Sequence, residues 1–199
     1  MKININNYNL SFEKQLKATA NILNNGKPER CYIYELNQED ADYFMPLRSK
    51  PEWQEEGFLP NIHQTVYDGE PSEHVFVIES KDEECLGVLE ADDDIIREDY
   101  QKIEFLETCS PYSHKNENRN RKYIGQTLLA FAAKFFGCKN KTALKIPSAV
   151  QASWGFYIDK CNFVQDKYIP YELMLEKEDF EKLITTNEQN TKGKIELVG

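Results

Sequence analysis

The residues best suited to a chemical task lie between Ile103 and Phe136, and the task is holding an anion. A strand-like segment there is followed by a polar, basic loop and by an amphipathic helix that opens near Gly125. The first turn of a helix leaves backbone N–H groups unpaired at the positive end of the helix dipole, and a glycine lets a ligand approach them. Arg119, Arg121 and Lys122 stand directly before this helix. The pattern favours a phosphate site over the alternative, an exposed basic loop without a ligand.

Other reactive side chains form weaker patterns. Cys109 and His114 lie close in the sequence, but no third group is evident that would orient them for nucleophilic catalysis. His63, His74 and His114 lack the spacing of metal ligands, and the Asp92-Asp93-Asp94 run lacks the regular pattern of a calcium loop. We therefore expect no metal site.

The loop and the helix start resemble a motif of the GNAT superfamily of acyl-CoA-dependent N-acyltransferases. Its members carry Arg/Gln-x-x-Gly-x-Gly/Ala between the fourth strand and the following helix, where the loop wraps the pyrophosphate of coenzyme A. The matching run here is Asn120-Arg121-Lys122-Tyr123-Ile124-Gly125, followed by Leu128 and Leu129. Asn120 replaces the family's Arg or Gln, and Tyr123 replaces its first glycine. The resemblance implies a cofactor-binding site formed by Arg119, Asn120, Arg121, Lys122, Tyr123, Ile124, Gly125, Gln126 and Thr127.

A second segment, from Ala152 to Phe163, resembles the family's Asn-x-x-Ala-x-x-Phe-Tyr-x-x-x-Gly-Phe, in which the tyrosine commonly protonates the departing thiolate of coenzyme A. By this resemblance Tyr157 is the candidate acid. No Asn sits at the expected place, and one extra residue separates Tyr157 from the Asn162-Phe163 pair. The shift would place Ile158 in the tyrosine position, with Tyr157 as a packed aromatic side chain. Both assignments stay open.

The resemblance implies transfer of an acyl group from acyl-CoA, with acetyl-CoA as co-substrate and no metal, to a primary amine of a small molecule or protein. A carboxylate within hydrogen-bond or one-water reach would take the proton from the acceptor ammonium. Glu104 and Glu107 lie on the strand beside the expected cleft and point to opposite faces. Glu104 is the preferred base, and the alternative is that it is an exposed strand residue.

The tetrahedral intermediate of this reaction needs a hydrogen-bond donor. The family draws it from a backbone N–H of the fourth strand near a local bulge. The corresponding place here is Leu106 to Cys109, so the predicted cofactor site also includes Leu106, Thr108 and Cys109.

Composition limits the class of partner. The chain has 199 residues and a formal net charge of −10, which argues against a nucleic-acid ligand and suits a cationic acceptor. The five widely spaced cysteines, without a C-x-x-C pair, indicate reduced thiols. The sequence contains no apolar run typical of a signal peptide or a membrane span. We expect a cytoplasmic monomer or homodimer that binds neither nucleic acid nor membrane.

Periodicity and turn residues predict one core domain of the α/β (α+β) class over residues 31–177. An N-terminal helical extension is expected over 1–30, with its amphipathic segment at Phe12 to Leu23 and a turn at Asn24 to Pro28. The tail, 178–199, starts helical, and its Lys194 to Val198 is either an added strand or a frayed end. Within the core we expect a strand at Cys31–Leu36, a helix from Asn37 to about Leu47, a short helix within Ser49–Gly69, strands at Glu73–Ser80, Cys85–Ala91 and Lys102–Cys109, a helix from Ile124 ending at Gly137, a strand at Thr142–Ile146, a helix at Ser148–Lys160, and strands at Phe163–Lys167 and Tyr171–Leu175.

The resulting order, β-α-α-β-β-β-α-β-α-β-β, is the one that the GNAT fold uses. It predicts a GNAT-like central, mostly antiparallel mixed sheet flanked by helices.

Two alternatives to an active enzyme stay open. Tyr123, the missing Asn and the polar insert from Tyr112 to Asn118 would also suit a catalytically inactive GNAT-like domain that serves as a binding or regulatory module. The Asn-rich N-terminal segment is compatible with a secreted effector acyltransferase that acts on a partner protein.

Overall fold

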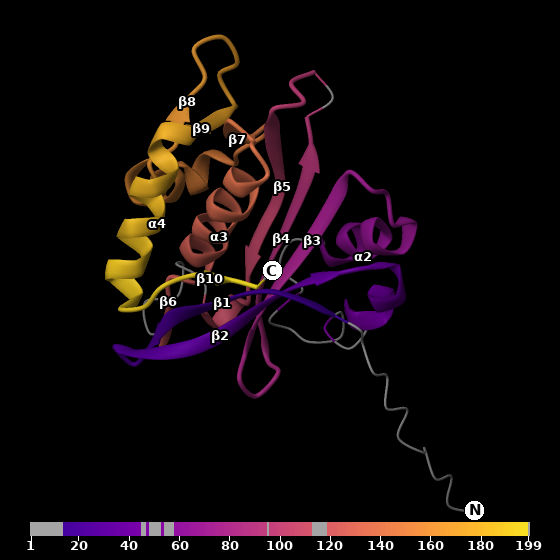
Figure 1. Ribbon diagram of the computed structural model, residues 1–199, viewed down its shortest axis with the longest axis vertical. Coiled ribbons are helices and arrows are strands. Elements are labelled where there is room, and N and C mark those ends of the chain that lie inside the picture. Colours follow the sequence, from indigo (N-terminus) through magenta and orange to yellow (C-terminus); the bar gives the residue numbers. More distant parts are fainter. Residues whose placement is uncertain are drawn as a thin grey trace, which may run out of the picture.

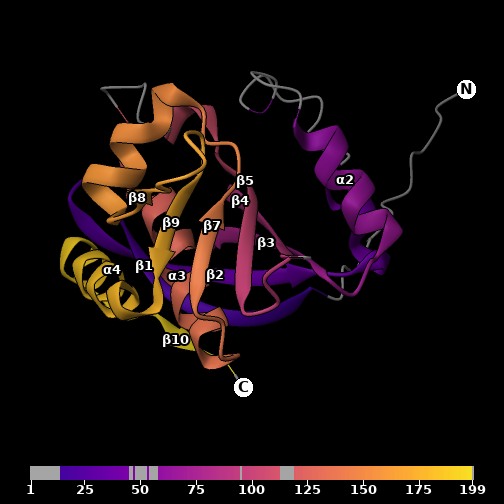
Figure 2. The ribbon, with the colours of Figure 1, turned by 90° about the horizontal axis from the view of Figure 1, so that it is seen from above.

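The computed structural model describes residues 14–44, 47, 53, 58–94, 96–112 and 119–198. These residues form one ten-stranded sheet in the order β10-β1-β2-β3-β4-β5-β7-β9-β8, with β6 paired to β1. Helices α3 (Ile124–Cys138) and α4 (Lys177–Thr191) cover one face, and α2 (Phe58–Asp68) lies on the other (Figures 1 and 2). Because β5 and β7 are the only parallel neighbours among these strands, the predicted fold class, a mostly antiparallel mixed sheet flanked by helices, is confirmed.

The first two strands, β1 (Gln15–Asn24) and β2 (Lys27–Leu36), form a hairpin around Asn25 and Gly26. Both turn residues have positive φ angles, 50° and 76°, as a tight two-residue hairpin turn requires. Ala18, Ala20 and Ile22 are fully buried and alternate with more accessible residues. The helix predicted over Phe12–Leu23 is therefore wrong in the part that the structure describes. Buried residues recur there at every second position, as in a strand, and not at every third or fourth position, as in a helix.

Both helices predicted between β2 and β3 are found in the described residues of that connection. The 3₁₀-helix η1 covers Gln38–Phe44, and its start is capped by the Asn37 Oδ1, which accepts a hydrogen bond from the Glu39 N–H at 2.8 Å. The helix was expected to continue to about Leu47; the 3₁₀-helix ends at Phe44, and residues 45 and 46 lie outside the described residues. The second helix is α2.

The strands β3 (Glu73–Ser80), β4 (Cys85–Asp93) and β5 (Tyr100–Thr108) form the predicted antiparallel meander. Their two faces carry separate cores. Phe76, Leu89 and Ile103 pack under α3, while Val75 and Val88 pack on the α2 side. Ligands on the two faces of this sheet would therefore be separated by its thickness, except where neighbouring strands part.

The helix α3 is buried along most of its length and packs against α4. Gly137, predicted to end it in a left-handed cap, lies inside the helix, and Lys139 is the C-cap, with Asn140 in the left-handed region at φ 65°. A Cβ at Gly137 would lie 3.2 Å from Phe180 of α4. The glycine therefore permits close helix packing and does not end the helix.

The sheet is completed by short strands from the C-terminal part of the chain: β7 (Ala143–Ile146), β8 (Val164–Gln165), β9 (Leu173–Glu176) and β10 (Glu196–Leu197). The helix predicted over Ser148–Lys160 is divided into a 3₁₀ turn, η4 (Gln151–Ser153), and a π-helix, η5 (Phe156–Lys160). Because β10 pairs with β1, the end of the tail is an added strand. Within the described ranges, no helix combines the length and the apolar character needed to cross a bilayer.

Candidate active site

The strands β5 and β7 are neighbours that part in the middle of the sheet. They pair through Tyr100, Gln101 and Lys102 of β5, whereas β5 continues to Thr108 (Figure 2). Among the described strands, none pairs with Ile103–Thr108 on that side. The segment therefore presents an open backbone edge, and an extended ligand that carries amide groups can pair with such an edge as a strand would.

The start of α3 lies against this open edge. A Cβ on Gly125 would lie 3.6 Å from Thr108, 3.7 Å from Leu106 and 3.3 Å from Phe156. The N–H of Thr127 donates to the Tyr123 carbonyl at 2.8 Å, and no side chain caps the helix. The N–H groups that precede Thr127 in the first turn therefore lie at the positive end of the dipole, which is the arrangement predicted for a phosphate.

Tyr123 occupies the place of the motif's first glycine and adopts a conformation that glycine favours, with φ 72° and ψ 11°. This left-handed conformation costs an ordinary residue about 1–2 kcal/mol. Its side chain is 37% exposed. The chain thus keeps the backbone turn that brings the helix start close to a ligand, and part of the tyrosine ring lies at the surface.

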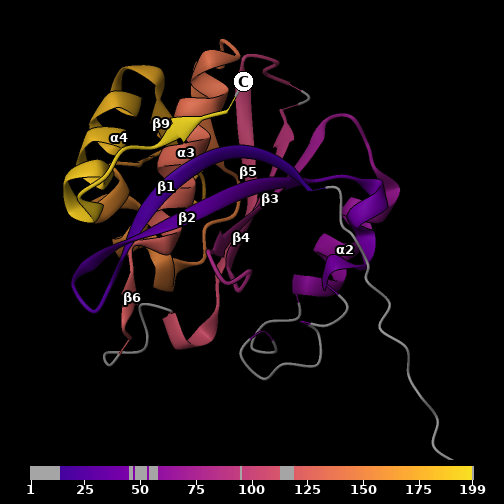
Figure 3. The same cartoon turned by 60° about the horizontal axis from the view of Figure 1, so that its bottom comes forward.

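Arg121 is held by carboxylates. It lies in β6 (Arg121–Lys122), beside the β1–β2 hairpin (Figure 3). Its buried guanidinium donates to both oxygens of Glu29 at 3.0 Å, to Glu84 at 2.5 Å and to the Tyr112 hydroxyl at 2.9 Å. These contacts fix the loop before α3 to the sheet. The guanidinium that the resemblance assigned to the cofactor site is therefore engaged by carboxylates of the chain itself.

The other predicted loop residues have different surroundings. Lys122 and Asn120 are exposed and Arg119 is half-buried. The Asn120 carbonyl accepts a hydrogen bond from the Asn25 N–H at 2.8 Å, so the β1–β2 turn supports this loop. Of these side chains, Lys122 is the exposed cation that directly precedes the helix start.

The side chains of Gln126 and Thr127 hold α3 in place through hydrogen bonds to other segments of the protein. The Gln126 amide donates to the Lys160 carbonyl at 2.6 Å and its oxygen accepts from Asn190 at 3.1 Å. The Thr127 hydroxyl lies 3.1 Å from the Asn187 amide oxygen. Since both side chains are buried and bonded within the protein, their contribution to an anion site would come from the backbone.

Tyr157 lies in the π-helix η5, whose wider turn holds one more residue than an α-helical turn. This accounts for the extra residue before Asn162, which itself takes the glycine-type conformation at φ 62°. The Tyr157 ring packs against Phe156 and Phe163, with centroids 5.2 Å and 5.9 Å away, while Ile158 is 37% exposed. Burial raises the pKa of Tyr157 to about 12. Its phenol is therefore protonated at neutral pH and chemically able to donate a proton.

The predicted carboxylates on β5 differ in environment. Glu104 is exposed, lies at a β-bulge and forms an ion pair with Lys102 at 3.2 Å, whereas Glu107 is half-buried. A bulge was expected near Leu106–Cys109, and the observed bulge lies directly before that segment. Cys109 is buried and already donates its N–H to a β4 carbonyl at 3.0 Å. The structure thus places the Glu104 bulge where β5 leaves β7, which is also where the open edge begins.

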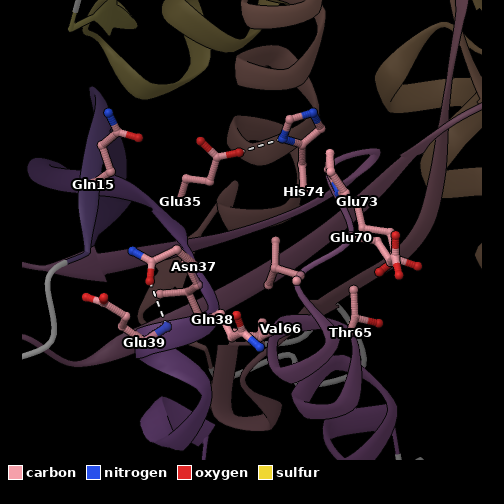
Figure 4. Close-up of a pocket in the computed structure, with 14 residues that line it drawn as sticks. Gln15, Glu35, Asn37, Gln38, Glu39, Thr65, Val66, Glu70, Glu73 and His74 are labelled. Atoms are coloured by element: carbon pink, nitrogen blue, oxygen red, sulfur yellow. Dashed lines mark hydrogen bonds and ion pairs between the residues drawn. The ribbon is translucent and has the colours of Figure 1, made fainter.

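A pocket of about 580 Å³ next to the end of α2 was missed by the sequence reasoning. It lies between the end of β2, the end of α2 and the start of β3 (Figure 4). Its wall carries the carboxylates of Glu35, Glu39, Glu70 and Glu73. These residues come from two segments, 35–39 and 65–75, that are distant in the sequence, so no local motif marks the pocket.

Glu90 of β4 lies directly beside this pocket. It pairs with Val75, which lines the pocket, and its Oε1 accepts a hydrogen bond at 2.9 Å from Thr65, another lining residue. The Glu90 side chain is 6% exposed, and its Oε2 has no hydrogen-bond partner within the part of the chain that the structure describes. The available sequence signal was a single acidic residue within the otherwise apolar run Cys85–Ala91.

Glu90 should make stability depend on pH. Burial, followed by repulsion from Glu73, Glu104 and Asp92, raises its pKa to about 7 against the opposing hydrogen bond of Thr65. An unfolded glutamate titrates near about pH 4.3, so between these values the folded state binds more protons and the free energy of unfolding falls as pH rises. We expect this group to cost about 3 kcal/mol by about pH 8.

Denaturant unfolding of the native chain and of Glu90→Gln, at about pH 5 and about pH 8, measures this effect. The variant should gain stability relative to the native chain as pH rises, because it removes the buried charge. An unchanged difference between the two proteins at both pH values would contradict the assignment.

Comparison with known proteins places this arrangement in a fold family. No protein-family model and no curated protein matches the sequence. Among solved structures, a spermidine N-acetyltransferase chimera of Vibrio cholerae SpeG and hSSAT is 14% identical, with a TM-score of 0.53 over 76% of this chain and 98% of that one. A GNAT-family acetyltransferase of Staphylococcus aureus is 12% identical, with a TM-score of 0.50 over 74% and 99%. The chain has the GNAT fold.

A third similar structure, a mutant of the AtaT toxin bound to the C-terminus of the antitoxin AtaR, is 13% identical, with a TM-score of 0.55 over 78% of this chain and 97% of that one. The GNAT fold predicted from the two motifs and the element order is confirmed by the similarity to the N-acetyltransferase structures. Counted from Cys31 along the chain, β5 is the fourth strand and α3 is the helix that follows it. Across the described residues, no cluster of three or more His, Cys, Asp or Glu side chains is suited to hold a metal ion.

Proposed function

We propose that this protein is an N-acetyltransferase that moves an acetyl group from acetyl-CoA to a primary amine. The observation that carries the proposal is the meeting of two features at Gly125: the uncapped start of α3 and the open edge of β5. Together they place a helix start that can bind an anion beside a strand edge that can pair with amide groups. Coenzyme A has both chemistries, a pyrophosphate and an amide-bearing arm. The structures to which the chain is similar in fold include N-acetyltransferases, and the family resemblance implies acetyl-CoA as the acetyl donor.

The residues present suit this co-substrate. The backbone N–H groups of Ile124, Gly125 and Gln126 would bind the pyrophosphate, with Lys122 adding positive charge. The edge of β5 from Ile103 to Thr108 would pair with the amides of the pantetheine arm. The ion-paired Arg121 would hold the loop in place while these contacts form.

Acetyl-CoA supplies the acetyl thioester, and the chain's own groups handle the protons. A carboxylate, with Glu104 and Glu107 as the candidates on β5, takes a proton from the acceptor ammonium so that the nitrogen lone pair can attack the carbonyl carbon. A backbone N–H of Leu106–Thr108 stabilises the oxygen of the tetrahedral intermediate. As the carbon–sulfur bond breaks, the Tyr157 hydroxyl gives its proton to the thiolate, and the nitrogen, positively charged after its attack, loses its second proton, which restores the Tyr157 phenol. Holding amine and thioester together supplies much of the rate.

An acetyl-transfer assay tests the proposal. Purified protein, acetyl-CoA and a panel of amines, including a linear diamine and a lysine peptide, are monitored for free thiol and for the acetylated product. We expect amine-dependent thiol release that saturates with acetyl-CoA. Product formed from no amine in the panel, together with absent acetyl-CoA binding, would overturn the proposal.

A second candidate function, a GNAT-like binding module without catalysis, is favoured by the contacts of Arg121. Its guanidinium is occupied by Glu29 and Glu84 and so is withheld from a phosphate. This alternative predicts that acetyl-CoA does not bind, or binds without turnover with any amine. The acceptor of the proposed enzyme is an amine of a small molecule or of a partner protein, and the antitoxin-bound toxin among the similar structures is a reason to include protein amines in the panel.

A further inference from the structure

The start of α3 and the π-helix η5 meet at two points. Gly125 lies against the first residue of η5, since a Cβ placed on it would be 3.3 Å from the Phe156 ring. The next residue, Gln126, reaches the last residue of η5, because its side-chain amide donates to the Lys160 carbonyl at 2.6 Å. Tyr157 lies between these two contacts. The position of η5 relative to the start of α3 is therefore set near both of its ends.

Both ends of the Gln126 amide group are bonded. Its nitrogen donates to the Lys160 carbonyl, and its oxygen accepts a hydrogen bond from Asn190 of α4 at 3.1 Å. Because a carbonyl can only accept, the amide orientation is determined. The carbonyls in the last turn of a helix have no partner within the helix, and the 3% exposed Gln126 supplies one. One side chain thus joins α3, α4 and η5.

Hydrogen bonds within η5 connect this contact to Tyr157. The Tyr157 carbonyl accepts from the N–H of Cys161 and, at 3.1 Å, from the N–H of Phe163. Cys161 directly follows Lys160 and is fully buried. A single turn of backbone therefore connects the carbonyl that Gln126 holds with the backbone of Tyr157. A displacement of the Lys160 end would also displace the phenol.

We propose that Gln126 is a positioning residue that holds the Tyr157 hydroxyl at a fixed distance from the start of α3. The inference rests on the proposed function, in which the start of α3 binds the pyrophosphate and Tyr157 protonates the thiolate. Both groups belong to one co-substrate, so the two sites must keep a matching separation. A misplacement of about 1 Å can lower a rate by about 100-fold. Gln126 acts through Tyr157, because its own side chain is bonded within the protein.

Gln126→Met tests this role, since methionine has a similar length and volume but no N–H donor. The kcat for acetyl transfer should fall by about 10-fold or more, while the dissociation constant of acetyl-CoA changes by less than about 2-fold. In a Tyr157→Phe background the same substitution should lower kcat by less than about 2-fold, because the positioned group is already absent. Equal losses in both backgrounds would indicate a general structural effect and overturn the inference.

Hydrogen exchange measures the same link without any activity. In Gln126→Met the amides of Cys161 and Phe163 should exchange about 5-fold faster or more, while those of β3 and β4 keep their native rates. The control is Asn190→Ala, which removes only the α4 partner of Gln126. It should leave kcat and the exchange in η5 as in the native chain. Unchanged exchange in Gln126→Met, or an equal increase in the control, would contradict the proposed link.

The outcomes also separate this inference from the proposed function. A native chain that acetylates no amine would overturn the function and, with it, the role of Tyr157 as proton donor. An active native chain with an equally active Gln126→Met variant would overturn the positioning role alone. If Gln126→Met does not fold, Gln126→Leu, which also lacks a donor, is measured in its place, with the same losses expected.

Discussion

Tyr157→Phe should lower kcat for acetyl transfer by about 100-fold or more, while KM for acetyl-CoA changes little. Phenylalanine can keep the ring contacts with Phe156 and Phe163 but has no proton to give. The pKa of Tyr157, raised to about 12 by burial, keeps the native phenol protonated throughout the neutral range. The lost function is therefore proton donation to the thiolate and not packing.

Steady-state kinetics with a matched control separate these roles. Tyr171→Phe makes the same chemical change at a residue that is 70% exposed and should leave kcat unaltered. Thermal unfolding should show both variants folded. Unaltered turnover in Tyr157→Phe would remove this residue from the mechanism and reopen the assignment of the donor position in η5.

Gly125→Val should weaken acetyl-CoA binding by about 100-fold, which corresponds to about 2.7 kcal/mol. A Cβ at this position already approaches Phe156 at 3.3 Å, and the additional methyl groups of valine must enter the space next to Thr108 and Leu106. They would displace η5 or fill the gap between α3 and the open edge. Gly125→Ala should show a smaller loss, because its Cβ requires a shift of a few tenths of an ångström.

Calorimetry with acetyl-CoA measures this loss, and another glycine provides the control. A Cβ at Gly155 meets its nearest neighbour, an oxygen of Asp159, at an ordinary 3.6 Å. Gly155→Ala should therefore bind acetyl-CoA as the native chain does. Normal binding by a folded Gly125→Val variant would show that coenzyme A does not pass the start of α3.

The elements that set this site were predictable because their signals are local. The strand alternation from Glu73 to Thr108 and the glycine at the start of α3 follow from neighbouring residues alone. The two short motifs then gave the family fold, which the structural comparison confirmed. The extra residue before Asn162 also had a local cause, the π-turn of η5, but a π-turn has no reliable sequence signature.

Long-range pairing set the limits of the prediction. The β1 segment was assigned to a helix because Phe12, Leu16, Ala20 and Leu23 would fall near one helical face. Its conformation is instead determined by nine partners on β2 and by the Asn25-Gly26 turn. The role of Arg121 depends on Glu29 and Glu84, which are distant in the sequence. The pocket beside Glu90 likewise forms from separate segments, so its charge could be recognised only after folding brought them together.

The most direct test of the central claim, that the start of α3 and the open edge of β5 hold acetyl-CoA, is a calorimetric titration of the native chain with acetyl-CoA. The account predicts saturable binding of one acetyl-CoA per chain, with a dissociation constant between about 1 μM and 1 mM. This binding should be about 100-fold weaker in the Gly125→Val variant. The absence of binding heat for the native chain at millimolar acetyl-CoA, confirmed by an unchanged melting temperature, would contradict it.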